Sequence, residues 1–310
     1  MLVLAAKRLF SMILIMVTVS FILFALFESD KFSVAGKVLG PYSSTEQREI
    51  WLEKNGYNEP FLERYLTWSL NAVQGDFGDS IQLKAPVADV LWPRLGNTAI
   101  LAGLVFAFMI PLSLTLGVIA GMKEGSVRDR SISITSVLTT SVPEFASATF
   151  LSAVFVYSLK WLPGTSAMIN GFSWAEIALP VMVLVLYGFG YIARMTRASM
   201  VEVMTSNYIR TAILKGIPYR RVILRHALRN ALIAPFTVIV LQMNWLLSGV
   251  IVVEVFFAYK GFGKLLLDAA LFGDIYVIEA CTLVAVFVAV FSQFISDIGY
   301  TLLNPRIRFS

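Results

Sequence analysis

The chain has 310 residues, of which 57% are hydrophobic and only 15% are charged. This composition excludes a soluble domain of that length and indicates a polytopic membrane protein. The net charge of +5 at pH 7 is no argument for nucleic-acid binding, because membrane proteins keep Lys and Arg in short cytoplasmic loops.

Six windows are long and apolar enough to cross a bilayer as helices, so we expect an all-α fold with six transmembrane helices. In chain order they cover residues 9–27, 98–122, 132–159, 177–193, 231–257 and 277–303. The first window follows two basic residues like a signal peptide, but it is long and no small-x-small cleavage pattern follows it. We therefore expect it to be a retained span.

Basic residues indicate which ends of the spans face the cytoplasm. Residues 194–229 hold eight Arg or Lys against one acid, whereas residues 28–97 hold ten acids and seven bases. Both termini should therefore be cytoplasmic. We expect three parts, namely 1–27 as N-terminus and first span, 28–97 as an extracytoplasmic helical cap, and 98–310 as a five-span core whose cytoplasmic loop covers about 194–230.

The cap should contain two helices, at 45–54 and 60–73, followed by a glycine-rich turn at 75–80. The apolar positions of the two helices are Trp51, Leu52, Leu62, Tyr65, Leu66 and Trp68. This spacing predicts that the helices pack together over the outer mouth.

The residue inventory argues against catalysis. His226 is the only histidine and lies in the basic loop, so neither an intramembrane base nor a two-histidine zinc site is available. The sequence has no Gly-x-x-x-x-Gly-Lys-Ser/Thr pattern for nucleotide phosphates. Cys281 is the only cysteine, which excludes an intrachain disulfide. We expect this chain to have no enzyme activity and to hold no metal or cofactor.

Polar residues in two windows mark a candidate pathway, because such groups are costly at membrane depth. Pro143 should kink or break the third window beside Ser141 and Glu144. Glu144 either lines a cavity, lies near the outer interface or pairs with another subunit. In the fifth window, polar and small residues form either a wall of the pathway or a helix contact. They are Gln242, Trp245, Ser248 and Gly249.

The basic loop has helix signals of its own. Ser206 or Asn207 can cap a short helix, and Gly216 can close it in the left-handed conformation. Pro218 then suits the first turn of a second helix. Charge alone would fit membrane topology or anionic lipid, but the ordered corner favours a docking protein.

One face of the first helix should supply the contact to that protein. Ile209, Ala212 and Ile213 fall together at helical spacing. We expect them to offer an apolar surface to the partner.

Motifs along the chain carry a resemblance to a known family. The run Tyr208-x-Arg-Thr-Ala-x-x-Lys-Gly216 and the run 225–231 are similar to the loop of the peptide/nickel/opine permeases of ABC importers. Six other segments resemble further elements of that branch. They are Gly75–Ser80, 94–98, 141–145, 161–163, 253–263 and 304–308. The strict Glu-Ala-Ala form of the loop is absent, because Arg-Thr-Ala occupies it.

The resemblance implies a type I ABC importer permease of the first-permease type in the bacterial inner membrane. Its partners would be a second homologous permease, two ATPases that bind ATP and Mg²⁺, and an extracytoplasmic binding protein. The loop would be a helix that couples the permease to an ATPase. The coupling residues would be Tyr208, Ile209, Arg210, Thr211, Ala212, Ile213, Lys215, Gly216, Pro218, Arg220 and Arg221.

The substrate stays open between peptides, opines, nickel chelates and glycosides, with peptides or peptide-like conjugates the commonest case. A secondary transporter and a passive scaffold are the alternatives. An internal repeat would favour a secondary transporter, but the sequence shows none. A scaffold would not need the polar, broken third window.

Overall fold

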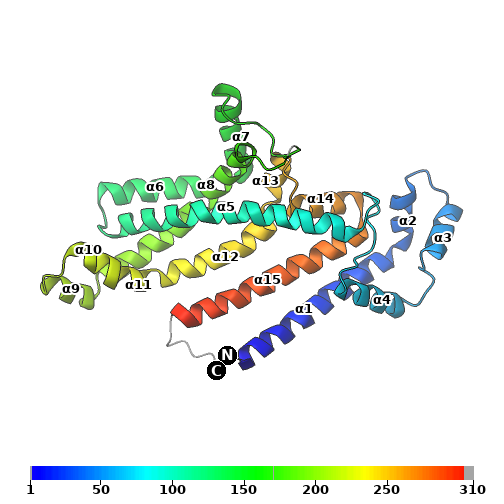
Figure 1. The fold of residues 1–310 in the computed structure, drawn as a ribbon, viewed down its shortest axis with the longest axis horizontal. Helices are drawn as coiled ribbons and strands as arrows, with labels where there is room; N and C mark the ends of the chain where they lie inside the picture. Colours follow the sequence, from blue (N-terminus) through cyan, green and yellow to red (C-terminus); the bar gives the residue numbers. More distant parts are fainter. Residues whose placement is uncertain (1, 170, 304–310) are drawn as a thin grey trace. The chain divides into compact units, whose positions relative to one another are not determined.

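A computed structural model describes the backbone of residues 2–169 and 171–303, and the side chains of those residues except 2–8, 28, 244, 247–249 and 296–303. Over the described backbone the chain is helical and has no β-strand, which confirms the predicted all-α class. The helices are α1 (Leu2–Ser29), α2 (Lys31–Leu39), α3 (Thr45–Lys54), α4 (Phe61–Val73), α5 (Val87–Gly121), α6 (Val127–Ser141), α7 (Glu144–Ser152), α8 (Trp174–Met204), α9 (Asn207–Leu214), α10 (Tyr219–Arg221), α11 (Leu228–Ala231), α12 (Ile233–Gly249), α13 (Ile251–Phe256), α14 (Phe262–Phe272) and α15 (Ile275–Leu303), with π-helical turns η1 (Ala153–Ser158) and η2 (Val222–Ala227) (Figure 1).

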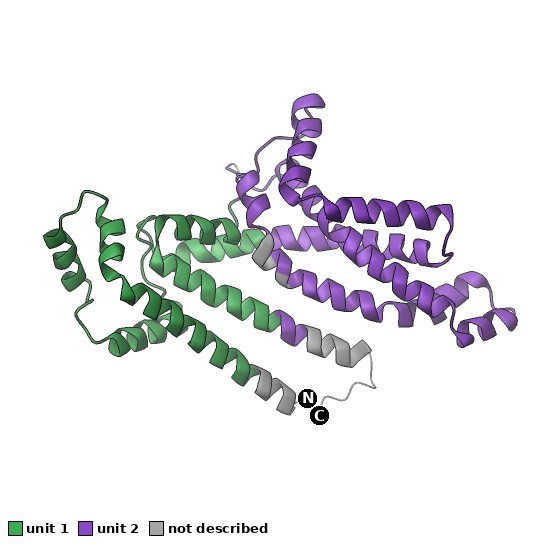
Figure 2. Cartoon of the chain, turned by 180° about the vertical axis from the view of Figure 1, so that it is seen from behind, with its two compact units in different colours: residues 1–98, 260–291 green, residues 99–259, 292–310 purple. Residues whose placement is uncertain are grey.

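The chain divides into two compact units (Figure 2). Unit one contains Met1–Thr98 and Lys260–Phe291, and unit two contains Ala99–Tyr259 and Ser292–Ser310. The chain therefore leaves unit one within α5, returns to it after Tyr259 and leaves it again within α15.

Four straight helices of the described chain are long and apolar enough to cross a membrane. They are Leu9–Phe27, Val87–Gly121, Trp174–Met204 and Ile275–Ile295. Two further spans are possible only as bent pairs, Val127–Ser141 with Glu144–Ser158 at 101° and Tyr219–Ala231 with Ile233–Met243 at 51°. The number of predicted spans is confirmed at six when each bent pair counts as one.

The third predicted span, 132–159, is therefore not one continuous helix. The break falls at Val142 and Pro143, where Pro143 has φ −59° and ψ 148° and starts α7. Proline supplies no N–H to a helix and its ring crowds the preceding turn. The predicted break at Pro143 is confirmed.

The fifth predicted span, 231–257, has wrong bounds. The helical segment begins earlier, at Tyr219, and α12 ends at Gly249 before the separate helix α13. The predicted window joined residues that belong to two separate helices, α12 and α13.

In unit one, α3 forms over the residues predicted for it. Ser44 and Gln47 make a capping box, since Gln47 N donates to Ser44 Oγ at 3.2 Å and Ser44 N donates to Gln47 Oε1 at 3.0 Å. This reciprocal pair satisfies two of the free N–H groups at the helix start. Two other helices, α2 and α14, were not predicted from the sequence, because they are short and only partly apolar.

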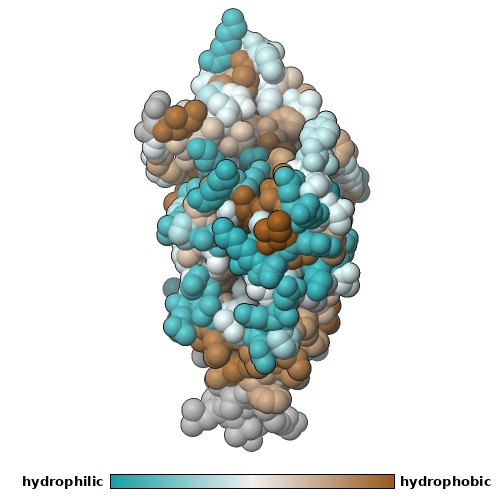
Figure 3. All heavy atoms as spheres, turned by 90° about the vertical axis from the view of Figure 1, so that its right-hand side faces the viewer, coloured by the Kyte–Doolittle hydropathy of each residue, from teal (hydrophilic) through white to brown (hydrophobic). Residues whose placement is uncertain are grey.

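The core of unit one joins the cap to the transmembrane helices of the same unit. Tyr65 and Trp68 of α4 are buried against Phe24 of α1, and the Tyr65 hydroxyl shares a hydrogen bond of 2.8 Å with Ser20. Two predicted apolar positions, Leu62 and Leu66, point outward instead. On the face seen in Figure 3, hydrophilic side chains gather around a few hydrophobic ones.

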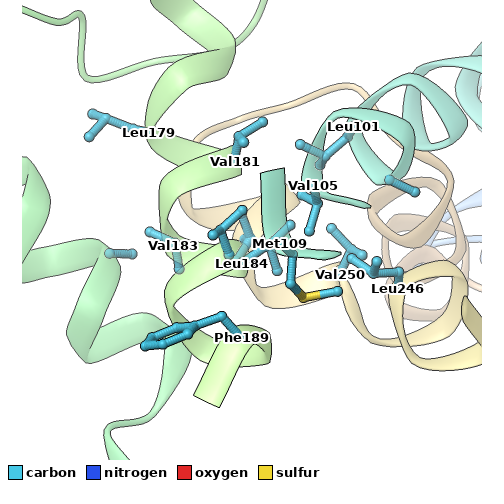
Figure 4. Packing of buried hydrophobic residues seen from close by; sticks show 14 of the residues in the cluster. Leu101, Val105, Met109, Leu179, Val181, Val183, Leu184, Phe189, Leu246 and Val250 are labelled. Atoms are coloured by element: carbon cyan, nitrogen blue, oxygen red, sulfur yellow. The ribbon is translucent and has the colours of Figure 1, made fainter. Parts of the chain in front are cut away.

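The core of unit two lies between α5, α8 and α12. Side chains of these helices interdigitate, with Met109, Leu184 and Leu246 among the fully buried ones (Figure 4). Both α6 and α12 pack on α8. A Cβ atom added at Gly190 of α8 would collide with the backbone carbonyl of Ser136 in α6. Helices in lipid approach this closely only where one of them carries a small residue.

Candidate functional site

The basic loop folds into the short helix predicted from the sequence, α9, but its start differs from the expectation. Ser206 occupies the N-cap position without a side-chain cap, because its Oγ donates to the carbonyl of Val203 at 2.6 Å. Neither Ser206 nor Asn207 therefore caps α9 by its side chain. The backbone bond from Arg210 N to Ser206 O, at 3.2 Å, closes the first turn.

The corner at the end of α9 is the one that the glycine predicts. Gly216 has φ +73° and its N–H donates to Ile213 O at 2.9 Å. This left-handed conformation is costly for other residue types. Pro218 then occupies the N-cap position of α10, one residue before the first turn that was predicted for it. Its φ of −54° suits that place.

Of the three apolar residues of α9 that were predicted to contact a partner, two are buried and only Ile213 is exposed. Ile209 and Ala212 are buried, in a cluster with Met200 of α8 and with Val222 and Ile223 of η2. They cannot offer a contact to a partner, because the chain itself covers them.

The outward face of the loop is apolar at its tip and basic around it. Ile213 is 47% exposed and Leu214 is 79% exposed. The other coupling residues predicted here are all exposed. They are Tyr208, Arg210, Thr211, Lys215, Gly216, Pro218, Arg220 and Arg221.

Hydrogen bonds fix the loop to the rest of unit two. Asn230 Nδ2 donates to the Tyr208 hydroxyl at 2.8 Å, and the Tyr219 hydroxyl donates to the carbonyl of Met122, at the end of α5, at 3.3 Å. The loop is therefore held at both of its helices and is no flexible tether.

A bidentate ion pair lies beside the loop. Arg197 of α8 donates from Nε to Asp129 Oδ1 at 2.6 Å and from Nη2 to Asp129 Oδ2 at 2.8 Å. The side chain of Asp129 is 3% exposed and that of Arg197 is 28% exposed. Asp129 also accepts from Gly125 N at 2.8 Å. The pair ties the α5–α6 turn to the end of α8, where the loop begins. Glu124, 61% exposed, is a looser partner of Arg197 at 3.6 Å.

The candidate pathway residues of the fifth window lie in a cavity of unit two. Gln242 and Trp245 of α12 line a space of about 240 Å³, and the Trp245 ring stacks on Tyr187 with the ring centroids 5.1 Å apart. The other lining residues are Thr140, Tyr187, Tyr191 and Arg194. The side chains of Ser248 and Gly249, also predicted, lie outside the described residues.

The predicted pathway residues of the third window do not line that cavity. Ser141 ends α6 and its hydroxyl donates to Val137 O at 2.8 Å. Glu144 is the first residue of α7, and its buried Oε2 has no hydrogen-bond partner among the described residues. Ser141, Pro143 and Glu144 are thus not among the residues that line the cavity with Gln242 and Trp245.

Sequence reasoning missed Arg194 as a cavity residue and counted it only as a topological charge. Its signal was present, because Tyr187, Tyr191 and Arg194 are spaced by four and three residues and so share one face of α8. Among the described residues Arg194 makes no ion pair, and its Nε donates weakly to Gly190 O at 3.4 Å. A cation without a carboxylate partner in a polar cavity is suited to attract anionic or carbonyl groups.

Comparison with known proteins gives the class to which this membrane-spanning helical chain belongs. The family described as "binding-protein-dependent transport system inner membrane component" matches residues 113–309. The chain is 34% identical over 279 residues to the oligopeptide transport system permease protein AppB of Bacillus subtilis, covering 88% of each chain. It is 34% identical over 303 residues to the glutathione transport system permease protein GsiC of Shigella flexneri, covering 98% of each.

The chain therefore belongs to the family of binding-protein-dependent inner-membrane permeases, the membrane-spanning subunits of ABC importers. This confirms the resemblance read from its motifs. The protein is a multi-pass inner-membrane transport subunit and not an enzyme, and permeases of this family work with ATPases and a binding protein.

The Asp129–Arg197 pair makes a prediction for stability. Replacing either residue (Asp129→Asn or Arg197→Met) should lower the free energy of unfolding of the purified chain by about 2 kcal/mol. Arg197→Met leaves the buried Asp129 carboxylate without its cation, and Asp129→Asn removes the anion that pairs with the partly buried guanidinium. The double variant should lose little more than a single one. Chemical unfolding followed by circular dichroism in detergent would measure this, with Glu124→Gln as the exposed control. Fully additive losses would show that the two side chains are not coupled.

Proposed function

We propose that the chain is one of two permeases that form the pathway of a peptide importer, and that a binding protein delivers peptides or peptide-like solutes to it. The oligopeptide, peptide and glutathione systems named for its relatives support this substrate class. The second permease would be a homologous subunit, and two ATPases would bind ATP and Mg²⁺. This chain would hold no cofactor. Both termini would lie in the cytoplasm and α2–α4 outside it.

The observation that carries the proposal is the outward tip of α9. Ile213 and Leu214 are exposed beside Lys215 and the open Gly216 corner. An exposed apolar patch with a polar rim is typical of a protein interface. This tip would dock into one ATPase, with the exposed arginines of α9 and α10 contacting acidic groups around it.

The buried side of the loop explains how docking would drive transport. Ile209 and Ala212 pack on Met200 of α8. Val118 of α5 and Met122, the residue after α5, lie against the same cluster. Movement of α9 with the ATPase would be passed directly to α5 and α8. Rigid-body movement of packed helices is a common form of such switching.

The cavity of Gln242, Trp245 and Arg194 would be part of the route of the solute. A peptide presents amide groups and a terminal carboxylate, which can hydrogen-bond to glutamine, tyrosine and arginine. Every lining residue carries such a group, and all but Arg194 are neutral. Neutral hydrogen bonds contribute little net free energy each, so binding there would be weak enough to let the solute pass.

Replacing Gly216 by Val should uncouple the ATPase from uptake. Nothing lies within 4 Å of an added Cβ, so the change acts only on the backbone, where φ +73° costs a β-branched residue about 1–3 kcal/mol. In vesicles with the complete transporter, ATP-driven peptide uptake should fall at least tenfold per ATP hydrolysed, with normal insertion. Gly75→Val, at φ +90° in equally open space in unit one, is the matched control. Coupled uptake at the wild-type level would contradict the proposed role of the corner.

Replacing Leu214 by Glu should weaken ATPase docking without affecting the fold, because the side chain is 79% exposed. The expected result is loss of ATPase subunits when the permease is purified by affinity tag. Val73→Glu, at 87% exposure in α4, should retain them. Equal ATPase recovery from both variants would place the interface elsewhere.

Replacing Gln242 by Leu should raise the peptide concentration needed for half-maximal uptake by roughly 2- to 10-fold, the effect of one neutral hydrogen bond. Gln74→Leu, an exposed glutamine after α4, is the control. Uptake kinetics identical in wild type and Gln242→Leu would remove this cavity from the solute's route.

A further inference from the structure

Unit one contains a cavity that the transport role described above does not use. It has a volume of about 530 Å³. It lies between the cap helices α3 and α4, the end of α1 and the start of α15. Aromatic rings form much of its wall. Those that matter here are Trp51, Tyr57, Trp68 and Tyr276.

The charged residues that line the cavity are mostly acidic. Glu59, Asp76, Asp79 and Glu279 contribute carboxylates, against one guanidinium, that of Arg64. The first three are exposed and Glu279 is 2% exposed. The acids at the surface thus surround the entrance, and one carboxylate lies in the interior.

Glu279 is the group that points to a ligand. Its Oε2 is buried and has no hydrogen-bond partner among the described residues. A buried polar atom left unpaired destabilises the fold, and a charged one does so more strongly. A donor that enters the cavity would remove that destabilisation.

The Arg64 guanidinium attracts the Glu279 carboxylate, but it donates no hydrogen bond to Glu279 Oε2. The guanidinium lies over the Tyr57 ring at 4.0 Å and near the Phe24 ring at 5.6 Å. Burial raises the pKa of the Tyr57 hydroxyl, so Tyr57 adds no negative charge. The cavity keeps an excess of carboxylates and aromatic surface beyond the part that Arg64 covers.

We propose that this cavity binds a primary ammonium group, with the Glu279 carboxylate as its hydrogen-bonded counter-ion and the aromatic wall around its apolar substituent. Carboxylate and aromatic rings together recognise organic cations, and the acidic entrance attracts them. The ammonium could belong to a small amine or to the amino terminus of a peptide.

Saturation-transfer NMR on the assembled transporter in lipid nanodiscs tests the site, with propylammonium, trialanine and N-acetyl-trialanine as probes. We expect the first two to bind and the acetylated peptide, which has no ammonium, not to bind through Glu279. Glu279→Gln keeps the size of the side chain and removes its charge, and should weaken binding about tenfold or more. Glu53→Gln, an exposed acid of α3 outside the cavity, is the matched control.

A second variant keeps the test decisive if Glu279→Gln folds poorly. Thr67→Trp changes an exposed residue at the cavity wall and should block entry while leaving Glu279 in place. Binding of trialanine alone would assign the site to peptides, and binding of propylammonium as well would assign it to amines in general. Signals unchanged in both variants, or absent for both ammonium probes in the wild type, would overturn the proposal.

Discussion

The contact of α8 with α5 and α6 at small residues holds unit two together. At Gly117 of α5 an added Cβ would lie 2.6 Å from the backbone oxygen of Ala193, and Gly190 meets α6 in the same way. Association in lipid gains little from hydrophobicity and depends on close packing. Helices that touch backbone to backbone have no soft side-chain layer between them. A displacement of α8 must therefore move its neighbours, because well-packed interfaces transmit strain instead of absorbing it.

The basic loop that contains α9 extends this packing from α8 to α9 and η2. The cluster around Ile209 and Ala212 continues from Met200, and the Asp129–Arg197 pair holds the α5–α6 turn against the same end of α8. An isolated helix of eight residues is unstable in water, so α9 owes its order to this support. The residues that make α9 rigid are then necessarily different from those free to bind a partner. That division is why the exposed tip consists of Ile213 and Leu214.

What could be predicted from the sequence depended on whether the cause was local. The break at Pro143 and the corner at Gly216 follow from the covalent structure of single residues, and both are present. Helical periodicity predicted that Ile209 and Ala212 share a face, but not that the chain itself covers it. Serine is a residue type that often caps helices, but the Ser206 hydroxyl donates to the carbonyl of Val203 instead. Short helices such as α2 and α14 are stabilised by tertiary packing, which a window of sequence does not contain.

The two tasks of the permease require opposite physical properties. In the proposed function, coupling needs a rigid part, which the buried side of α9 would provide. A pathway needs contacts that a solute can leave, since tight binding of one state would stop the cycle. The cavity at Gln242 and Trp245 fits the second need, because it offers neutral hydrogen-bonding groups and one cation without enclosing its contents. If this cavity is part of the route as proposed, selectivity would come largely from the protein that delivers the solute. Such a division would account for two relatives, each 34% identical to this chain, that are named for oligopeptide and for glutathione transport.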